Sequence, residues 1–504
     1  MQKASTRFNE VAYQTKPAPG VPWDKGSPAI NGPDIYGASP EKDFLYLIPT
    51  VGERPVRFFA ENLPAGLIVE KESGRIKGKA EKKGQYLVSL KAENRHGKCA
   101  KTLKLVIDDN ALALTPPMGW NSWNCYRSDI DNAKIRAIAD GMVSSGLAAR
   151  GYTCVNMDSG WQSKKRGGKF NSIVPHDGFP DMQALCDHIH SLGLKAGIYS
   201  SPYTVPLGTD GCGTSSGIRD TNYRGGVGIN KHEHEDVCQW AEWGFDYLKY
   251  DWSPTDMILM ERMSRALRDS PRDIIFSVCT DVHIKDAFKV KELANLWRSN
   301  MDMFPTWDSV LKNGFKNNQL MDDGFINNQD WNPVIGFGHW FDLDLTHLMP
   351  KFLHSMPDFL PREDKGLSQN ERIFHISCWM MRPSPILIDC EPATMDDFVL
   401  SLLCNEEIIA VNQDSLGKPA ATFFNNDSWK IQIKPLADGN YALAFFNLSG
   451  QPAMAPKINL SQFSVPEKFK VRDLWAKEDI GEFEHNFVVG VDSHCAKVFK
   501  IFMR

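Results

Sequence analysis

The sequence lacks several features that would place it in a common class. Among its 504 residues no apolar run approaches the roughly 20 that span a bilayer, so we expect no membrane insertion. The net charge of −5 is small for this length, so we expect no nucleic-acid partner. The 11 cysteines stand singly, without a CxxC pair, which argues against a zinc ribbon or a small disulfide scaffold.

The composition that is present describes a globular protein of several domains. A chain of 504 residues is too long for one ordinary core, so two or three domains are expected. Hydrophobic residues at 42% and charged residues at 24% are typical of globular proteins. The 14 tryptophans are a weak indication of sugar binding, because sugar pockets commonly use flat apolar faces.

Residues 31–110 predict a β-sandwich behind an N-terminal extension, residues 1–30. The stretches "RPVRFFAENLPAGLIVE" and "GQYLVSLKAENRHGKCAKTLKLVI" alternate as half-exposed strands do, with proline and glycine turns between them. The pattern resembles the immunoglobulin-like domain often found ahead of bacterial carbohydrate enzymes. We expect this domain to brace its neighbour rather than to bind sugar.

Residues 111–415 predict a (β/α)8 barrel, the TIM barrel. Short apolar runs with polar ends, such as "GYTCVNMD", "LKAGIYS" and "FDYLKYDW", alternate with amphipathic stretches such as "DMQALCDHIHSLGL". About eight such strand candidates fit a closed parallel barrel with insertions. In residues 416–504 the helical signal stops, and hairpin-like runs predict a C-terminal antiparallel β-sandwich.

The predicted strand ends carry many acidic residues. In a TIM barrel the chemistry lies at the carboxyl ends of the strands. There the sequence places Asp158, Asp251 and Asp344, with Lys249 and Arg298 as cations. Carboxylates grouped in this way could hold a divalent metal, or a pair of them could hydrolyse a glycoside. The two cations and the lack of a convincing histidine cluster weaken the metal interpretation, so we expect no metal and no other cofactor.

Five motifs then occur in the order found in one known family. They are "TPPMGWNSWN" (115–124), "LKYDW" (248–252), "LWRSNMD" (296–302), "GHWFDLDL" (338–345) and "NEEIIAVNQDSLGK" (405–418). Together they resemble glycoside hydrolase family 27, the α-galactosidases and α-N-acetylgalactosaminidases. The resemblance implies a carbohydrate substrate, a retaining mechanism and no cofactor.

The resemblance also implies a role for each matching residue. Asp251 takes the position of the nucleophile and Asp302 that of the acid/base. Substrate-binding positions fall on Trp123, Asp158, Ser159, Tyr199, Lys249, Thr280, Arg298 and Asp344. We expect the cation of Lys249 to keep Asp251 ionised, and the charge of Asp251 to keep Asp302 protonated at the start of the reaction.

Three departures from the family pattern concern specificity and cross-linking. Ser159 stands where the family usually has a second acid, which weakens the expected hold on an axial 4-hydroxyl. Thr280 replaces a large glutamate beside the 2-hydroxyl, which favours a roomier pocket. A disulfide of eukaryotic members would place one cysteine at Cys212, but Ser253 occupies the second position, so no such bridge is predicted.

We therefore predict a retaining exo-acting α-galactosidase. The alternatives within the family are an α-N-acetylgalactosaminidase, a β-L-arabinopyranosidase or an α-glucan-cleaving enzyme, and outside it a carbohydrate-binding protein without catalysis. The first 20 residues lack a signal-peptide pattern. We nevertheless expect a secreted or periplasmic protein whose leader has been removed, because an immunoglobulin-like domain ahead of a barrel is common in exported enzymes. The oligomeric state does not follow from the sequence.

Overall fold

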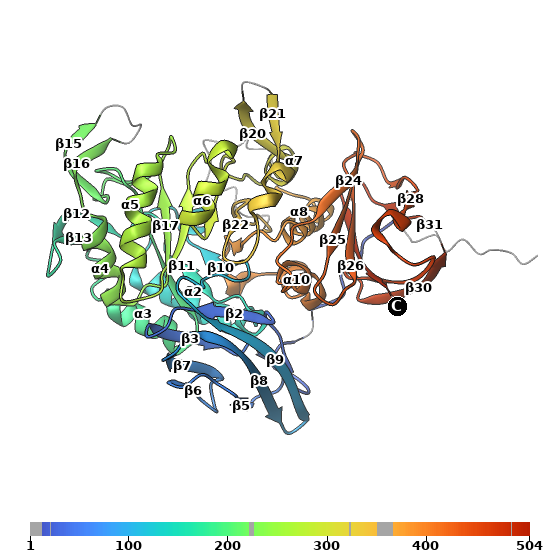
Figure 1. Cartoon of the computed structure of the whole chain (residues 1–504), viewed down its shortest axis with the longest axis horizontal. Helices are drawn as coiled ribbons and strands as arrows, with labels where there is room; N and C mark the ends of the chain where they lie inside the picture. The colour runs from blue at the N-terminus through green and yellow to red at the C-terminus, as the bar shows by residue number, and fades with distance from the viewer. Residues whose placement is uncertain are drawn as a thin grey trace, which may run out of the picture.

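The computed structural model has three units: a central barrel, an N-terminal β domain and a C-terminal β domain (Figure 1). It describes residues 13–20, 22–220, 226–321, 324–349, 366–484 and 486–503. Residues 1–12 of the predicted extension lie outside the described residues. None of the described helices is long and apolar enough to cross a membrane.

The N-terminal unit is a β domain of two small sheets. One sheet has the strand order β2 (Ile35–Ala38), β9 (Gly97–Ile107), β8 (Gly84–Asn94) and β5 (Arg57–Glu61), and the other β3 (Asp43–Leu47), β7 (Arg75–Lys79) and β6 (Leu67–Val69). A short ribbon joins β1 (Ala29–Ile30) to β4 (Thr50–Val51). Alternate residues of β8 and β9 face one core, in which Val88 pairs with Leu103. The strand prediction for this region is confirmed, while its immunoglobulin-like character stays a prediction.

The central unit is the predicted parallel barrel. In spatial order its strands are β22 (Trp340–Phe341), β19 (Leu296–Trp297), β18 (Ile275–Cys279), β17 (Tyr247–Asp251), β14 (Lys195–Ser200), β11 (Cys154–Asn156), β10 (Met118–Asn121) and β23 (Ile386–Ile388). All neighbouring pairs are parallel, and Thr346, just beyond β22, bridges Ile388 to close the ring.

Helices connect successive strands and cover the outside of the barrel (Figure 1). They are α2 (Asn132–Ser144), α3 (Met182–Ser191), α4 (Glu233–Trp243), α5 (Met257–Arg268), α6 (Ala287–Leu293), α7 (Trp307–Phe315) and α8 (Gln369–Met381), with α9 (Asp397–Leu403) and α10 (Glu406–Asn412) after the last strand. The predicted amphipathic face of α3 is buried through Met182, Leu185 and Ile189, and Asp181 caps the helix by accepting from the Ala184 N–H.

Smaller elements fill the connections. The short helix α1 (Trp123–Tyr126) follows β10, and three hairpins are β12 (Gln162–Gly167) with β13 (Ser172–Pro175), β15 (Ser215–Asp220) with β16 (Val227–Lys231), and β20 (Lys316–Met321) with β21 (Gly324–Asn327). The 3-10 helices are η1 (Ala148–Arg150), η2 (Ile284–Asp286), η3 (Asn328–Val334), η5 (Pro392–Thr394) and η6 (Leu460–Phe463).

The C-terminal unit is the predicted antiparallel β-sandwich. Its main sheet has the order β24 (Ala421–Asn425), β25 (Trp429–Pro435), β26 (Tyr441–Asn447), β33 (Ala496–Phe502), β29 (Lys468–Asp473) and β30 (Glu478–Glu484). Two further pairs are β27 (Ala453–Met454) with β32 (Gly490–Val491), and β28 (Ile458–Asn459) with β31 (Asn486–Phe487). The sheet packs on α8, where the Trp475 indole N–H donates to the Ser377 hydroxyl at 3.0 Å.

The N-terminal domain lies at the end of the barrel where the strands begin. Its Arg75 guanidinium donates to the Ser191 carbonyl at 2.7 Å, and the Ser39 N–H donates to Asp273 at 2.7 Å, two residues before β18. A cavity at this junction is lined by residues of both units, including Tyr36 and Lys195. The domain therefore lies away from the carboxyl ends of the strands, and its bracing role stays a prediction.

Candidate active site

The barrel brings the predicted site residues to one end. Trp123 and Asp158 come two residues after their strands, Tyr199, Lys249 and Asp251 lie within the last residues of theirs, and Thr280 and Arg298 directly follow theirs. Ser159, Asp302 and Asp344 stand in the loops that continue from β11, β19 and β22. All ten therefore lie at the carboxyl ends of parallel strands, where TIM-barrel sites are found.

The pattern of β17 explains why a hydrophobic strand ends in Lys249 and Asp251. Side chains of a strand alternate between its two faces. Leu248 and Tyr250 are fully buried in the core, whereas Tyr247 and Lys249 line a small cavity inside the barrel. Asp251, two residues beyond Lys249, is on the same face as this lysine. The strand thus presents its polar residues to the inside of the barrel and its apolar residues to the surrounding core.

Lys249 is held by a buried carboxylate. Its ammonium lies 2.8 Å from Asp158 Oδ2, and Asn121 Nδ2 donates to the same oxygen at 2.9 Å. Asp158 Oδ1 accepts from the Ser159 N–H at 2.8 Å. Burial alone would lower the pKa of Lys249, but Asp158 and the other acidic groups around it together outweigh burial and raise that pKa well above its ordinary value. The lysine is therefore a permanent cation on the floor of the site.

Asp251 is the end of β17 and accepts a hydrogen bond from a neighbouring strand. The Tyr199 hydroxyl donates to Asp251 Oδ2 at 3.1 Å, and in the sheet register Asp251 lies opposite Cys279 of β18. Burial raises the pKa of Asp251 to about 6. Lys249 works against this rise, while the charges of Asp302 and Asp158 add to it. Asp251 is therefore ionised in the free protein only above about pH 6.

Arg298 connects the remaining acids. Its guanidinium donates to Asp302 Oδ1 at 2.8 Å and to Cys279 Sγ at 3.2 Å, and it lies 3.3 Å from Asp344 Oδ1. The Asp344 backbone has a φ of 78°, in the left-handed region, and its N–H donates to Asp342 Oδ1 at 2.8 Å. Cys279 is also the register partner of Asp251, and Arg298 donates to both Cys279 and Asp302, so these two residues link the two predicted catalytic acids.

The order of the two pKa values differs from the sequence-based expectation. Burial acts to raise the pKa of Asp302, but Arg298, Lys249 and Arg127 outweigh it and hold this pKa below its ordinary value of 3.8. The Asp302 side chain is 65% exposed to solvent. The expectation that Asp251 is the more acidic of the two is wrong for the free protein, because the cations around Asp302 together outweigh burial, whereas at Asp251 burial prevails over Lys249.

The rim of the site contains a feature that the sequence analysis missed. The Arg127 guanidinium lies 5.2 Å from the centroid of the Trp123 ring, and it contributes positive charge near Asp302 and Asp158. Arg127 has a φ of 52° and a ψ of −131°, a conformation that favours glycine. Gly208 packs directly against the Trp123 ring, since a Cβ there would lie 2.3 Å from Cη2 of Trp123. The only sequence signal for Arg127 was its place shortly after the first strand.

The two residues that depart from the family pattern are both small and hydrogen-bonded within the protein. The Ser159 hydroxyl donates to the Leu207 carbonyl at 2.9 Å. The Thr280 hydroxyl lies 3.2 Å from that of Thr255. Neither residue brings a charge to the pocket. Cys212 is a free thiol, as are the other cysteines of the chain.

Tryptophan content proved a poor guide to the site. Nine tryptophans are fully buried, among them Trp120 and Trp161, whose indole N–H groups donate to backbone carbonyls at 3.0 Å and 2.9 Å. Most of the tryptophans therefore build the core, and Trp123 is the one placed at the pocket by the sequence motif. In the described part of the chain no group of three or more His, Cys, Asp or Glu side chains is arranged to hold a metal ion.

The comparisons with known proteins agree with this geometry. A family model described as Alpha galactosidase A matches residues 115–414, and one described as Alpha galactosidase C-terminal beta sandwich domain matches residues 426–501. The chain is 34% identical to the alpha-galactosidase of Coffea arabica over 397 residues, 77% of this chain and 94% of that protein. It is 31% identical to that of Cyamopsis tetragonoloba over 442 residues, 86% of this chain and 94% of that protein.

A solved structure extends the likeness to nearly the whole chain. It belongs to a Bacteroides fragilis protein provisionally named an alpha-galactosidase/melibiase, with 31% identity and a TM-score of 0.82. The match covers 95% of this chain and 99% of that one, so it includes the N-terminal β domain as well as the barrel and the sandwich. The chain therefore belongs to glycoside hydrolase family 27, the alpha-galactosidase family, and is a glycoside hydrolase.

Proposed function

We propose that the enzyme is a retaining exo-acting α-galactosidase that removes terminal α-linked galactose. The observation that carries this proposal is that Arg298 donates both to Asp302 and to Cys279, the register partner of Asp251, at the carboxyl end of the parallel barrel. The curated relatives from Coffea arabica and Cyamopsis tetragonoloba carry the same activity in their names.

The mechanism assigns one role to each carboxyl group. Asp251, oriented by the Tyr199 hydroxyl, attacks the anomeric carbon above pH 6 as the carboxylate, and forms a glycosyl ester. Asp302 gives a proton to the departing oxygen; it then takes a proton from the water that attacks the anomeric carbon, which breaks the ester bond and releases Asp251 as the carboxylate. In the free protein Asp302 is paired with Arg298 and prefers to be ionised. We propose that sugar hydroxyls draw the Arg298 donors away and that the leaving group shields Asp302 from water, so its pKa rises in the complex.

The test of this mechanism follows the anomer that is released first. With an aryl α-D-galactopyranoside, proton NMR should show α-galactose before mutarotation, and first release of β-galactose would refute retention. Asp251→Asn should lower kcat by about 1,000-fold or more while the protein stays folded. Asp281→Asn, which removes an acid just beyond β18 that accepts from the Ser253 hydroxyl, serves as the matched control and should retain activity.

A second sugar is favoured by the Ser159 hydrogen bond. Because Ser159 is uncharged and donates to the Leu207 carbonyl, the 4- and 6-hydroxyls of galactose lack the second acidic acceptor usual in the family. A β-L-arabinopyranoside has the same ring configuration as an α-D-galactopyranoside but lacks C6 and its hydroxyl, so it would lose only the contact to the 4-hydroxyl. An aryl glycoside panel of α-galactoside, β-L-arabinopyranoside, α-N-acetylgalactosaminide and α-glucoside decides between them. Clear preference for another sugar over the galactoside would replace the first proposal.

Where the protein acts stays a prediction. A secreted or periplasmic location was expected from the sequence, and fractionation of the native host tests it, since recovery with cytoplasmic markers would contradict export.

A further inference from the structure

A fully buried ion pair lies behind the loop that carries Asp302. His347 Nδ1 and Asp389 Oδ2 are 2.6 Å apart, and both side chains are 0% exposed. His347 follows β22 by six residues, and Asp389 directly follows β23. Removing two charges from water is costly and is often no more stabilising than apolar packing, so a buried pair of this kind suggests a role beyond stability. Neither residue belongs to the family motifs that identified the site.

The histidine holds the backbone next to Asp302. His347 Nε2 lies 2.7 Å from the Met303 carbonyl, to which it donates, and the Met303 N–H donates to Asp344 Oδ2 at 2.7 Å. Burial would lower the pKa of His347, but Asp389 and the Met303 carbonyl together outweigh it and raise this pKa, which favours the imidazolium form, in which both ring nitrogens are donors. The main chain of the residue directly after Asp302 is therefore fixed at both its N–H and its carbonyl.

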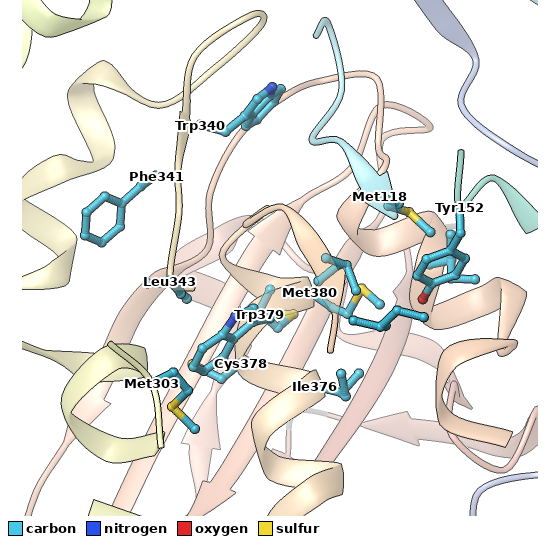
Figure 2. Packing of buried hydrophobic residues seen from close by; sticks show 14 of the residues in the cluster. Met118, Tyr152, Met303, Trp340, Phe341, Leu343, Ile376, Cys378, Trp379 and Met380 are labelled. Carbon is cyan, nitrogen blue, oxygen red and sulfur yellow. The ribbon is translucent and has the colours of Figure 1, made fainter. Parts of the chain in front are cut away.

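The Met303 side chain fixes the same residue by packing in the core. It is 1% exposed and belongs to the buried cluster that also contains Leu343 and Trp379 (Figure 2). Asp302, by contrast, extends from this anchor with a side chain that is 65% exposed. Packing restrains an exposed side chain little, so in the free protein its direction depends on the hydrogen bond from Arg298 and on the backbone that carries it. The anchor at Met303 thus limits where the Asp302 carboxyl group can reach, also when substrate displaces Arg298.

Asp389 connects this anchor to the opposite wall of the pocket. Asn124 Nδ2 donates to Asp389 Oδ2 at 3.1 Å. Asn124 is buried and stands in the short helix α1, directly after Trp123. One carboxylate therefore contacts both the helix that carries the aromatic wall and the histidine that fixes the Asp302 loop.

We infer that His347 and Asp389 are positioning residues for the acid/base step: through the Met303 carbonyl they hold Asp302 at the distance from which it can protonate the leaving oxygen. The inference rests on the proposed function of Asp302. Misplacing a catalytic group by about 1 Å can cost about 100-fold in rate. The loss of rate should appear only with leaving groups that must be protonated by Asp302. A strongly acidic phenol departs as the phenolate and needs no proton.

The experiment compares two leaving groups on one sugar. For methyl α-D-galactopyranoside, we expect His347→Gln and Asp389→Asn to lower kcat/KM by roughly 10- to 100-fold. For 2,4-dinitrophenyl α-D-galactopyranoside we expect a change of less than about 3-fold, since kcat/KM there reports a bond cleavage without proton transfer. If the panel selects another sugar, the same pair of aglycones is used on that sugar. Asn412→Ala, which removes buried bonds to the Ser384 and Trp379 carbonyls, is the matched control and should show no dependence on the leaving group.

Three outcomes separate this inference from the function on which it rests. If Asp302→Asn shows no dependence on the leaving group, the proposed role of Asp302 is wrong. If Asp302→Asn does depend on the leaving group, but His347→Gln and Asp389→Asn lower kcat/KM equally for both substrates, the pair is only structural and the inference is overturned. If the inference holds, His347→Gln adds no further loss with the methyl glycoside in an Asp302→Asn background. Should His347→Gln fail to fold, the nearly isosteric Asp389→Asn carries the same comparison.

Discussion

The proposed nucleophile is expected to destabilise the fold, and its removal should stabilise the protein. Burial raises the pKa of Asp251 from the ordinary 3.8 to about 6, so the folded protein disfavours the charge that catalysis needs. Asparagine has nearly the same shape and cannot ionise. We therefore predict that Asp251→Asn is inactive but more stable than the wild type at neutral pH, as is common where a site trades stability for function.

The size and pH dependence of the effect follow from the pKa rise. A group whose pKa is higher in the folded state binds its proton more tightly there, so the wild type loses stability as pH rises from about 4 to about 6. At pH 7.5 the loss amounts to about 3 kcal/mol, since one pKa unit corresponds to about 1.4 kcal/mol. At pH 4.5 the same relation gives a loss of only about 1 kcal/mol. The free energy of unfolding of Asp251→Asn should exceed that of the wild type by about these amounts at the two pH values.

The assay is urea unfolding followed by tryptophan fluorescence at the two pH values. Asp246→Asn is the matched control, because Asp246 directly precedes β17, the strand that Asp251 ends, and is also buried. Burial would raise the pKa of Asp246, but Arg272 at 2.7 Å and His190 at 2.8 Å outweigh it and lower that pKa. Its removal should therefore destabilise the protein, by about 3–5 kcal/mol. A less stable Asp251→Asn protein at pH 7.5, or a gain that is equal at both pH values, would refute the reasoning.

Three further predictions concern Lys249 inside the barrel, Gly208 beside Trp123, and Arg75 of the N-terminal domain. Lys249→Met should move the acidic limb of the pH profile of kcat/KM to higher pH, because the lysine ammonium lowers the pKa of Asp251. Lys249→Arg keeps the positive charge and should leave this limb in place. If the limb is unchanged in both variants, Asp251 is not the group that titrates there. Gly208→Ala should lower kcat/KM by about 10-fold or more, because its Cβ would meet the Trp123 ring and its φ of 76° is strained for alanine; steady-state kinetics beside a melting curve test this, and an unaltered KM and kcat would speak against it. Arg75→Ala should lower the melting temperature and leave kcat unchanged, since it loses bonds to the barrel on the face opposite the site; a fall in kcat would show that the N-terminal domain acts on catalysis.

The sequence alone determined the barrel, its strand ends and the family. Strands that are buried on both faces read as short apolar runs, and the alternation of β17 placed Lys249 and Asp251 on one face whatever the rest of the chain does. Because parallel barrel strands all end at the same rim, order along the chain sufficed to predict that the ten site residues would lie at one end of the barrel.

Only the tertiary structure decided the electrostatics and the supports of the site. The pKa order of Asp251 and Asp302 depends on how far nearby cations, Arg298 above all, offset the burial of each carboxyl group, and neither distance nor burial can be read from spacing. His347 and Asp389 are 42 positions apart and meet because two neighbouring strands close the barrel beside them. Such contacts depend on the folded path of the chain, so the sequence shows that the acids are present but not how each one is held.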